Sequence, residues 1–162
     1  MPIDLFRVDD RLIHGQVVIG WGQALSTDFI ILVDDAVAQS QWEQELYRMG
    51  APEEMELVFA SVAEAARRLE SWRADSRHGI LLTGDVDTMA RLVDETHRIG
   101  AINLGGIHHR GGRVQRARYI YLAPEEEAAL RALEALGVRV SAQDVPSARP
   151  LPLTELLKAH PI

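Results

Sequence analysis

Short apolar runs alternate with longer amphipathic stretches, and this alternation limits the fold more than any other feature of the chain. Five runs have the length and composition of strands: Ile3–Val8, Phe29–Val33, Glu56–Ala60, Gly79–Thr83 and Ala101–Leu104. The stretches between them space their apolar residues as helices do, over Leu12–Leu25, Gln41–Met49, Val62–Ala74 and Val86–Ile99. Five strand–helix alternations predict an α/β fold with an open, mostly parallel sheet and helices on both faces.

The pattern changes after Gly105. Residues 110–112 (RGG) predict a turn, and Val114–Leu122 alternates in part like a strand. Pro124–Leu136 is predicted to be a helix, because proline and three glutamates stand at its start and Gly137 follows its end. We further expect a late strand over Val138–Val145 and a short closing helix over Leu151–Ala159. We find no linker, repeat or low-complexity tract, so one domain is expected over residues 1–162.

Composition excludes several classes of protein. A chain of 162 residues can bury a core without disulfides, and the absence of cysteine excludes a disulfide framework or a thiolate metal site. A formal net charge of −7 argues against nucleic acid as a partner. The N-terminus lacks the pattern of a signal peptide, and no apolar run approaches the ~18 residues of a membrane-spanning helix. These features predict a cytosolic protein.

Ligands in open α/β sheets bind outside the carboxyl ends of the strands, so the residues after each run are site candidates. The first run delivers the richest set, because the stretch RVDDRLIHGQ at residues 7–16 concentrates charge and a histidine there. Later runs bring Asp34, Asp35, Ser61, Thr83, Gly84, Asp85, Gly105, Gly106, His108, His109 and Arg110 to the same edge. We therefore expect the functional site at this edge.

His14 is predicted to stand beside Gly15 at the start of a helix, where free backbone N–H groups and the helix dipole favour an anion. Arg11 could reach the same anion with a planar guanidinium. An imidazole can act as a nucleophile or base near neutral pH, and an aspartate bonded to its opposite nitrogen could orient it. The same residues also fit a simpler interpretation, in which His14 is a partly exposed residue and Asp10 and Arg11 form a solvated pair.

The stretch RVDDRLIHGQ resembles the signature of the enzyme IIB component of the mannose/fructose/sorbose-type sugar phosphotransferase system (PTS). Residues 102–106 (INLGG), followed by residues 110–115 (RGGRVQ), resemble that family's second block. Asp34-Asp35, residues 83–86 and the chain length also fit, so the resemblance covers nearly the whole chain. It implies a mixed sheet with an antiparallel strand near the C-terminus.

The resemblance also implies a function. His14 would accept a phosphoryl group on Nδ1 from a phosphohistidine of a IIA partner and pass it to a sugar held by membrane IIC–IID subunits. The catalytic set would be His14, Arg11 and Asp10, with phosphate contacts from Gly15, Gln16, Thr83 and Arg110. No cofactor or metal is expected, because the donor is itself a phosphohistidine and the chain has no G-x-x-x-x-G-K-[ST] loop. A homo-oligomer is compatible with this reading.

Two other functions stay open at this stage. Without IIC and IID partners, the domain could be a regulatory phosphocarrier or a phosphorylation-state sensor that binds a protein target. A metal-dependent hydrolase would need His14 together with His108 and His109, but adjacent histidines on an extended segment point to opposite sides. We therefore expect exposed loop histidines, one of which borders the His14 pocket. Arg110 and Arg113 fit either phosphate or partner contacts or a solvated turn.

The remaining polar and aromatic candidates have structural interpretations. Asp34-Asp35 could form an acidic pocket like that of a receiver domain, but we favour a helix-capping pair. The three tryptophans are expected in the core or in a subunit contact rather than in a sugar platform; they are Trp21, Trp42 and Trp72. His108, His109 and Val114 stand where many family members have other aromatic or hydroxyl-bearing residues. For this reason the identity of the sugar does not carry over from the resemblance.

Overall fold

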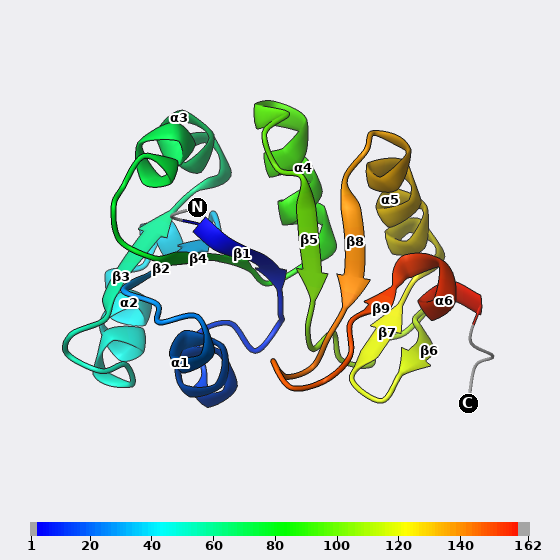
Figure 1. Cartoon of the computed structure of the whole chain (residues 1–162), viewed down its shortest axis with the longest axis horizontal. Coiled ribbons are helices and arrows are strands. Elements are labelled where there is room, and N and C mark those ends of the chain that lie inside the picture. Colours follow the sequence, from blue (N-terminus) through cyan, green and yellow to red (C-terminus); the bar gives the residue numbers. More distant parts are fainter. Residues whose placement is uncertain (1–2, 159–162) are drawn as a thin grey trace.

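The structure, a computed structural model, describes residues 3–158 and contains a seven-stranded sheet in the order β3-β2-β4-β1-β5-β8-β9. The strands pair in parallel except for β9, which runs antiparallel to β8 at one edge (Figure 1). Their bounds are β1 (Ile3–Val8), β2 (Phe29–Val33), β3 (Glu56–Ala60), β4 (Gly79–Thr83), β5 (Ala101–Leu104), β8 (Arg139–Ala142) and β9 (Leu151–Pro152). The predicted mostly parallel sheet with an antiparallel C-terminal strand is confirmed.

Helices cover both faces of the sheet, as predicted (Figure 1). Three lie above the sheet in this view: α3 (Val62–Arg73), α4 (Val86–Thr96) and α5 (Pro124–Ala135). Below it lie α2 (Gln41–Met49), preceded by the 3₁₀ turn η2 (Val37–Gln39), and a helix that begins with the π-helical segment η1 (Gln16–Trp21) and continues as the α-helical turn α1 (Gly22–Ala24). The short helix α6 (Leu153–Lys158) packs beside β8 and β9. Within residues 3–158, no helix has both the length and the apolar character needed to cross a membrane.

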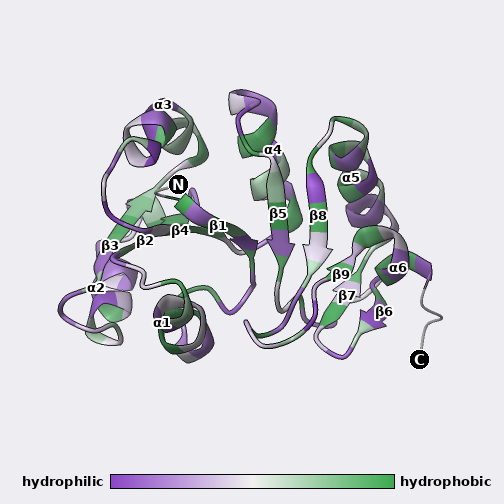
Figure 2. Ribbon diagram, in the orientation of Figure 1, coloured by the Kyte–Doolittle hydropathy of each residue, from purple (hydrophilic) through white to green (hydrophobic). Residues whose placement is uncertain are grey.

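Two apolar layers, one on each face of the sheet, form the core. β2 and β4 are buried at every position and contribute side chains to both layers, which is why they read as continuous apolar runs. Figure 2 shows these hydrophobic strands beneath helices of mixed hydropathy. Trp72 lies in one layer and Trp21 in the other, so the core prediction is confirmed for both. Trp42, in contrast, is 66% exposed on α2.

After β5 the chain forms a separate antiparallel hairpin of β6 (Val114–Ala117) and β7 (Ile120–Leu122). The sequence predicted one partly alternating strand here, and the structure divides it with a two-residue turn. α5 then begins at Pro124, as predicted. The carboxylate of Glu126 accepts a hydrogen bond from the backbone N–H of Ala123 (2.8 Å), which satisfies a donor at the start of the helix.

Two predicted helices are shorter than expected because a residue with positive φ stands at one end. The helix predicted from Leu12 begins only at residue 15, since Leu12 has a φ of 61° and cannot continue a right-handed helix. His14 therefore stands directly before the helix. The helix predicted to reach Ile99 ends at Thr96, because His97 adopts a left-handed conformation with a φ of 52°.

The C-terminal segment also differs from the prediction. The late strand stops at Ala142, although the backbone N–H of Gln143 still donates to the carbonyl of Leu104 at the end of β5 (3.0 Å). The predicted closing helix begins two residues late, because Leu151 and Pro152 first pair with Ala142 and Ser141 as β9. Ala159, the last residue of that predicted helix, lies outside the described residues.

Candidate functional site

The loops after β1 and β5 lie against each other at the carboxyl edge of the sheet. The backbone N–H of Gly105 donates to the carbonyl of Val8 (2.7 Å), and that of Asp10 donates to the carbonyl of Gly106 (2.8 Å). A Cβ on Gly105 would lie 2.5 Å from Oδ2 of Asp9, and one on Gly106 would lie 3.0 Å from Nε of Arg11. The two glycines are therefore needed because charged side chains occupy the space beside them.

Asp9 is the centre of this charged cluster. Its side chain is fully buried, and Oδ2 lies 2.8 Å from Nη2 of Arg11, 3.2 Å from Nη2 of Arg7 and 3.4 Å from Nε2 of His14. Oδ1 accepts hydrogen bonds from Nε (2.9 Å) and the backbone N–H (3.1 Å) of Arg11. Burial by itself would raise the pKa of Asp9, but His14, Arg11 and Arg7 together hold that pKa well below its usual range. Asp9 is therefore an anion that three partners share.

Arg7 supports Asp9 from inside the protein. Its guanidinium is fully buried, and Nη1 donates to the side-chain oxygen of Asn103 and to the carbonyl of Gln143 (2.8 Å). Nη2 also donates to the carbonyl of Asp144 (3.1 Å), and Cζ lies 4.8 Å from the centre of the Trp21 ring. Burial lowers the pKa of Arg7, and the charge of Asp9 opposes that change. This network fixes the carboxylate of Asp9 on its inner side.

The two nitrogens of the His14 ring have different surroundings. Nε2 is buried and faces Asp9, whereas Nδ1 accepts a hydrogen bond from the backbone N–H of Gln16 (3.2 Å). This arrangement fits a neutral ring with its proton on Nε2 and a lone pair on Nδ1. The side chain of Gln16 accepts a hydrogen bond from Nη1 of Arg11 (2.8 Å), so the outer guanidinium edge lies near the same ring. The side chain of His14 is 17% exposed, and Gly15 beside it is exposed.

The other predicted site residues lie farther from this centre or face elsewhere. Asp10 faces His108, with Oδ1 2.6 Å from Nδ1 of that ring and Oδ2 accepting from its backbone N–H (2.7 Å). Thr83 is fully buried, and its hydroxyl donates to the carbonyl of Asp85 (3.1 Å). Arg110 is exposed in the turn after β5. The structure thus brings His14, Arg11 and Gln16 together, but not Asp10, Thr83 or Arg110.

The predicted capping pair and loop histidines are confirmed. Asp34 accepts hydrogen bonds from the N–H groups that open η2, and Asp35 accepts one from Val62 at the start of α3 (2.9 Å). His108 and His109 are both exposed, and the ring of His109 packs edge-on against Tyr121. Among residues 3–158, no group of three or more histidine, aspartate or glutamate side chains is placed to hold a metal ion.

Sequence reasoning placed Asp9 at this edge of the sheet but gave it no role, and it did not single out Arg7. A partial signal was present, because residues 7 and 9 stand two apart at the end of a predicted strand and should share one side. The structure shows the ion pair of Arg7 with Asp9, and the turn after β1 brings Arg11 to the same carboxylate. Asn103 and the carbonyls of Gln143 and Asp144 carry no comparable signal, because only the folded chain brings them to Arg7.

Comparison with known proteins places the chain in a family. Residues 3–161 match the family model described as PTS system sorbose subfamily IIB component. The PTS system sorbose-specific EIIB component of Klebsiella pneumoniae is 30% identical over 147 residues, which cover 91% of this chain and 90% of that protein. The PTS system mannose-specific EIIAB component of Escherichia coli is 29% identical over 157 residues, which cover 97% of this chain and 49% of that protein.

A solved structure agrees with these sequence matches. The IIBSor domain of the sorbose permease from Klebsiella pneumoniae superposes with a TM-score of 0.87 and 28% identity, covering 98% of this chain and 97% of that domain. The agreement includes the sheet that carries the loops after β1 and β5. The chain therefore belongs to the sorbose-subfamily IIB components of the sugar phosphotransferase system.

Proposed function

We propose that this chain is a protein-histidine sugar phosphotransferase, in which His14 accepts a phosphoryl group from a phosphohistidine on a IIA partner and passes it to a sugar during uptake. The observation that carries this proposal is the placement of the buried Asp9 carboxylate 3.4 Å from Nε2 of His14. An anion at that nitrogen favours the proton there and leaves the Nδ1 lone pair as the nucleophile. Asp9 would also stabilise the positive charge that develops on the ring.

The transfer step follows from this geometry. The lone pair of Nδ1 forms a bond to phosphorus, the N–P bond of the donor phosphohistidine breaks, and its electron pair returns to the donor ring. The backbone N–H of Gln16, which donates to Nδ1 in the unmodified ring, would then donate to a phosphoryl oxygen. Among residues 3–158, the outer Nη1 of Arg11 donates only to the exposed Gln16 side chain, so it can turn to the phosphoryl group. Such a reaction depends on positioning and charge stabilisation.

Asp10 has a different part in this proposal from the one expected from the sequence. It binds His108 through both carboxylate oxygens and so ties the loop after β1 to the loop after β5. We assign Asp10 to positioning of the loop and Asp9 to the histidine itself. Gly15 belongs to the phosphate site through its exposed backbone, and Arg110 to the surface that a partner approaches. The buried hydroxyl of Thr83 gives no support to a direct phosphate contact.

The partners of the proposed reaction follow from the family. The mannose-specific relative of Escherichia coli carries both A and B in its name, and this chain matches about half of its length, 49%. This supports a IIA phosphocarrier as the donor. We propose that the phosphoryl group passes to the sugar at IIC–IID membrane subunits. We name no particular sugar, because one relative is named for sorbose and another for mannose.

The decisive experiment is transfer from a phosphorylated IIA protein, followed by mass spectrometry of the intact chain under neutral conditions. Wild type should gain one acid-labile phosphate, with or without EDTA, and His14→Ala should gain none while staying folded. The matched control is His109→Ala, an exposed loop histidine that should be phosphorylated as wild type. Equal phosphorylation of His14→Ala and wild type would refute the assignment, and loss of transfer in EDTA would refute the metal-free mechanism.

A second stage separates transport from regulation. Phosphorylated protein is mixed with membranes that contain IIC and IID, with and without sugar. Sugar-dependent loss of the phosphate, with formation of sugar phosphate, is expected for the transport function. If the phosphate stays on His14 in the presence of every sugar that such membranes take up, the regulatory phosphocarrier becomes the better account.

A further inference from the structure

Helix α2 turns its large apolar side chains to solvent. Trp42, Leu46 and Met49 are 66%, 55% and 82% exposed, and they are three of the five large apolar side chains that are exposed among residues 3–158. Their spacing of four and then three residues places them on one face of the helix. They therefore form a continuous apolar surface along α2, which we call the α2 stripe.

The opposite face of α2 holds the helix against the protein. Tyr47 packs against the apolar layer on this side of the sheet and stacks on Phe59, with ring centres 6.1 Å apart. The side-chain amide of Gln44 donates to the carbonyls of Val37 (2.9 Å) and Ala38 (3.2 Å). At 3.6 residues per turn, these anchors lie on the side of the helix away from the stripe. The fold itself therefore fixes the stripe in its exposed position.

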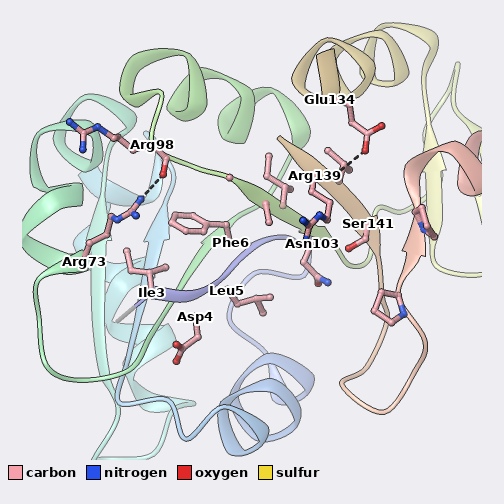
Figure 3. Close-up of a pocket in the computed structure, with 16 residues that line it drawn as sticks. Ile3, Asp4, Leu5, Phe6, Arg73, Arg98, Asn103, Glu134, Arg139 and Ser141 are labelled. Atoms are coloured by element: carbon pink, nitrogen blue, oxygen red, sulfur yellow. Dashed lines mark hydrogen bonds between the residues drawn. The ribbon is translucent and has the colours of Figure 1, made fainter. Parts of the chain in front are cut away.

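Exposed apolar residues on a monomer are usually scattered, whereas a contiguous apolar patch marks an interaction surface. The pocket at the amino-terminal edge of the sheet lacks such a patch (Figure 3). Its Leu5 and Phe6 pack with the apolar layers of opposite faces of the sheet, and both arginines and carboxylates line it. The α2 stripe, in contrast, is one apolar face on one helix.

The charges around the stripe are mostly negative. Residues 41–54, which comprise α2 and the five residues after it, contain four glutamates and one arginine. Glu45, Glu53 and Glu54 are exposed, and among residues 3–158 none of the four glutamates forms an ion pair. The arginine, Arg48, lies over an aromatic ring at 5.0 Å. This surface is therefore complementary to a partner that presents apolar side chains flanked by lysine or arginine.

The stripe is on the same side of the molecule as the helix that follows His14. Both helices cover one face of the sheet, and Tyr47 shares its apolar layer with Val17 and Trp21 (Figure 1). α2 follows the carboxyl end of β2 through η2, and β2 is parallel to β4 and β4 to β1. The first turn of α2, with Trp42, therefore begins at the edge of the sheet that carries His14.

We propose that the α2 stripe docks a basic cytoplasmic loop of the IIC–IID membrane subunits, a partner whose identity rests on the proposed function. Cytoplasmic loops of membrane proteins carry an excess of lysine and arginine, which suits the glutamates around the stripe. Tryptophan and methionine are among the residues enriched at protein interfaces. A second copy of the chain would bring two negative surfaces together, and an anionic lipid surface would repel the same glutamates.

The test uses the whole chain and inverted membrane vesicles that contain IIC and IID. The double variant Trp42→Gln/Leu46→Gln replaces exposed side chains, so it should fold as wild type, which circular dichroism and urea denaturation check. Formation of sugar phosphate should need at least about tenfold more phosphorylated variant than wild type for its half-maximal rate, because two interface anchors are lost. The maximal rate should change little, and transfer from phosphorylated IIA to His14 should match wild type.

Two further variants sharpen the test. Leu136→Gln, which removes a 65% exposed leucine after α5 on the other face of the sheet, should behave as wild type in every assay. Glu45→Lys reverses one charge beside the stripe and should also weaken docking. The effect of Glu45→Lys should shrink as the salt concentration rises, because exposed charges are screened. A Glu45→Lys variant that docks as well as wild type at low salt would contradict the basic partner.

Sedimentation of the unphosphorylated chain with vesicles identifies the occupant. Wild type should sediment with IIC–IID vesicles, the double variant should not, and neither should sediment with protein-free vesicles of phosphatidylcholine and phosphatidylglycerol. Three results would overturn the proposal by assigning the stripe elsewhere: equal binding to protein-free vesicles, a dimer in analytical ultracentrifugation that the double variant abolishes, or an equal loss of transfer from IIA. Equal sedimentation of wild type and the double variant with IIC–IID vesicles would show that the stripe is not the docking surface.

Failure of this proposal can be distinguished from failure of the proposed function. If wild type takes up no phosphate from IIA, the function assigned to His14 is wrong. Sedimentation with IIC–IID vesicles requires no phosphate, so it still decides whether the stripe docks the membrane subunits.

Discussion

Asp9 and Asp10 are adjacent in the chain, yet each faces a different histidine in a different environment. The side chain of Asp9 is fully buried, and its carboxylate lies between His14, Arg11 and Arg7. Asp10 and His108 meet at 2.6 Å, but their side chains are 26% and 70% exposed. Because solvent weakens charge interactions, the first pair is strongly coupled to the fold and the second contributes little. The two aspartate–histidine pairs therefore differ in burial and in the two arginines that share Asp9.

The end of β1 and the turn that follows it produce this difference. Arg7 and Asp9, two residues apart at the end of β1, share the inner side. In the turn that follows, the N–H of Leu12 donates to the carbonyl of Asp9 (3.0 Å), Arg11 lies beside Asp9, and Asp10 faces the neighbouring loop. Leu12, with its φ of 61°, then reverses the chain and returns His14 to Asp9 rather than to Asp10. The side chain of Leu12 occupies space beside Gly84, where an added Cβ would meet it at 2.8 Å. A rare backbone conformation therefore selects the partner of the histidine.

Asp9→Asn is expected to have the largest effect on both stability and phosphoryl transfer. The buried Arg7 would lose its anionic partner, and the proton on Nε2 of His14 would lose the carboxylate that orients it. We expect a loss of about 3–5 kcal/mol in the free energy of unfolding, because a buried charge is left unpaired. Phosphoryl transfer to His14 should fall about 10³–10⁴-fold. Urea denaturation and single-turnover transfer from phosphorylated IIA measure the two effects.

Asp10→Asn is the matched control for that substitution. It changes the same functional group one residue away, and its partner His108 is largely exposed. Stability should change by less than about 1 kcal/mol. If Asp10→Asn were as damaging as Asp9→Asn, burial would not be what separates the two pairs.

Arg11→Ala should affect transfer strongly and stability weakly. The side chain is 30% exposed, and Arg7 remains to balance the charge of Asp9. Transfer should slow about 10²–10³-fold, as for the loss of one preorganised donor to a developing charge. Arg11→Lys should recover only part of the rate, because an ammonium lacks the planar fork. A stopped-flow or quenched single-turnover assay with full activity in Arg11→Ala would remove this residue from the mechanism.

Much of this fold could be predicted from the sequence, because its strands are buried on both faces and its helices have clear end signals. The five apolar runs agree with β1 to β5, and Pro124 begins α5. The sequence predicted an aspartate partner for His14 but not that this partner is Asp9, since the positive φ of Leu12 that turns His14 toward Asp9 leaves no pattern in composition or spacing. The backbone partners of Arg7 could not be predicted either, because the carbonyls that bind it are 136 and 137 residues away in the chain.

Acid should weaken the fold through Asp9. The pKa of Asp9 is lower in the folded protein than the value of about 3.9 expected in the unfolded chain. The stabilisation is therefore complete above that unfolded value and is lost as the pH falls below it toward the folded value. Wild type should lose up to about 1.4 kcal/mol per pH unit from this group in that range. Urea denaturation between about pH 5 and pH 2.5 should show a shallower slope for Asp9→Asn, and parallel slopes would contradict this account.

The smallest expected effect is that of His108→Ala. The ring is largely exposed, so its contact with Asp10 should contribute less than about 1 kcal/mol to the free energy of unfolding. The backbone N–H of residue 108 still donates to Asp10 in the variant, and Arg113 still donates to the carbonyl of that residue (2.8 Å), so the loop keeps two of its anchors. The rate of transfer to His14 should stay within a few-fold of wild type. Raising the salt concentration should reduce even that difference in rate, because exposed charges are screened over about 8 Å at physiological ionic strength. A loss of transfer as large as that of Arg11→Ala, measured in the same single-turnover assay, would mean that His108 contacts the phosphoryl group or its donor.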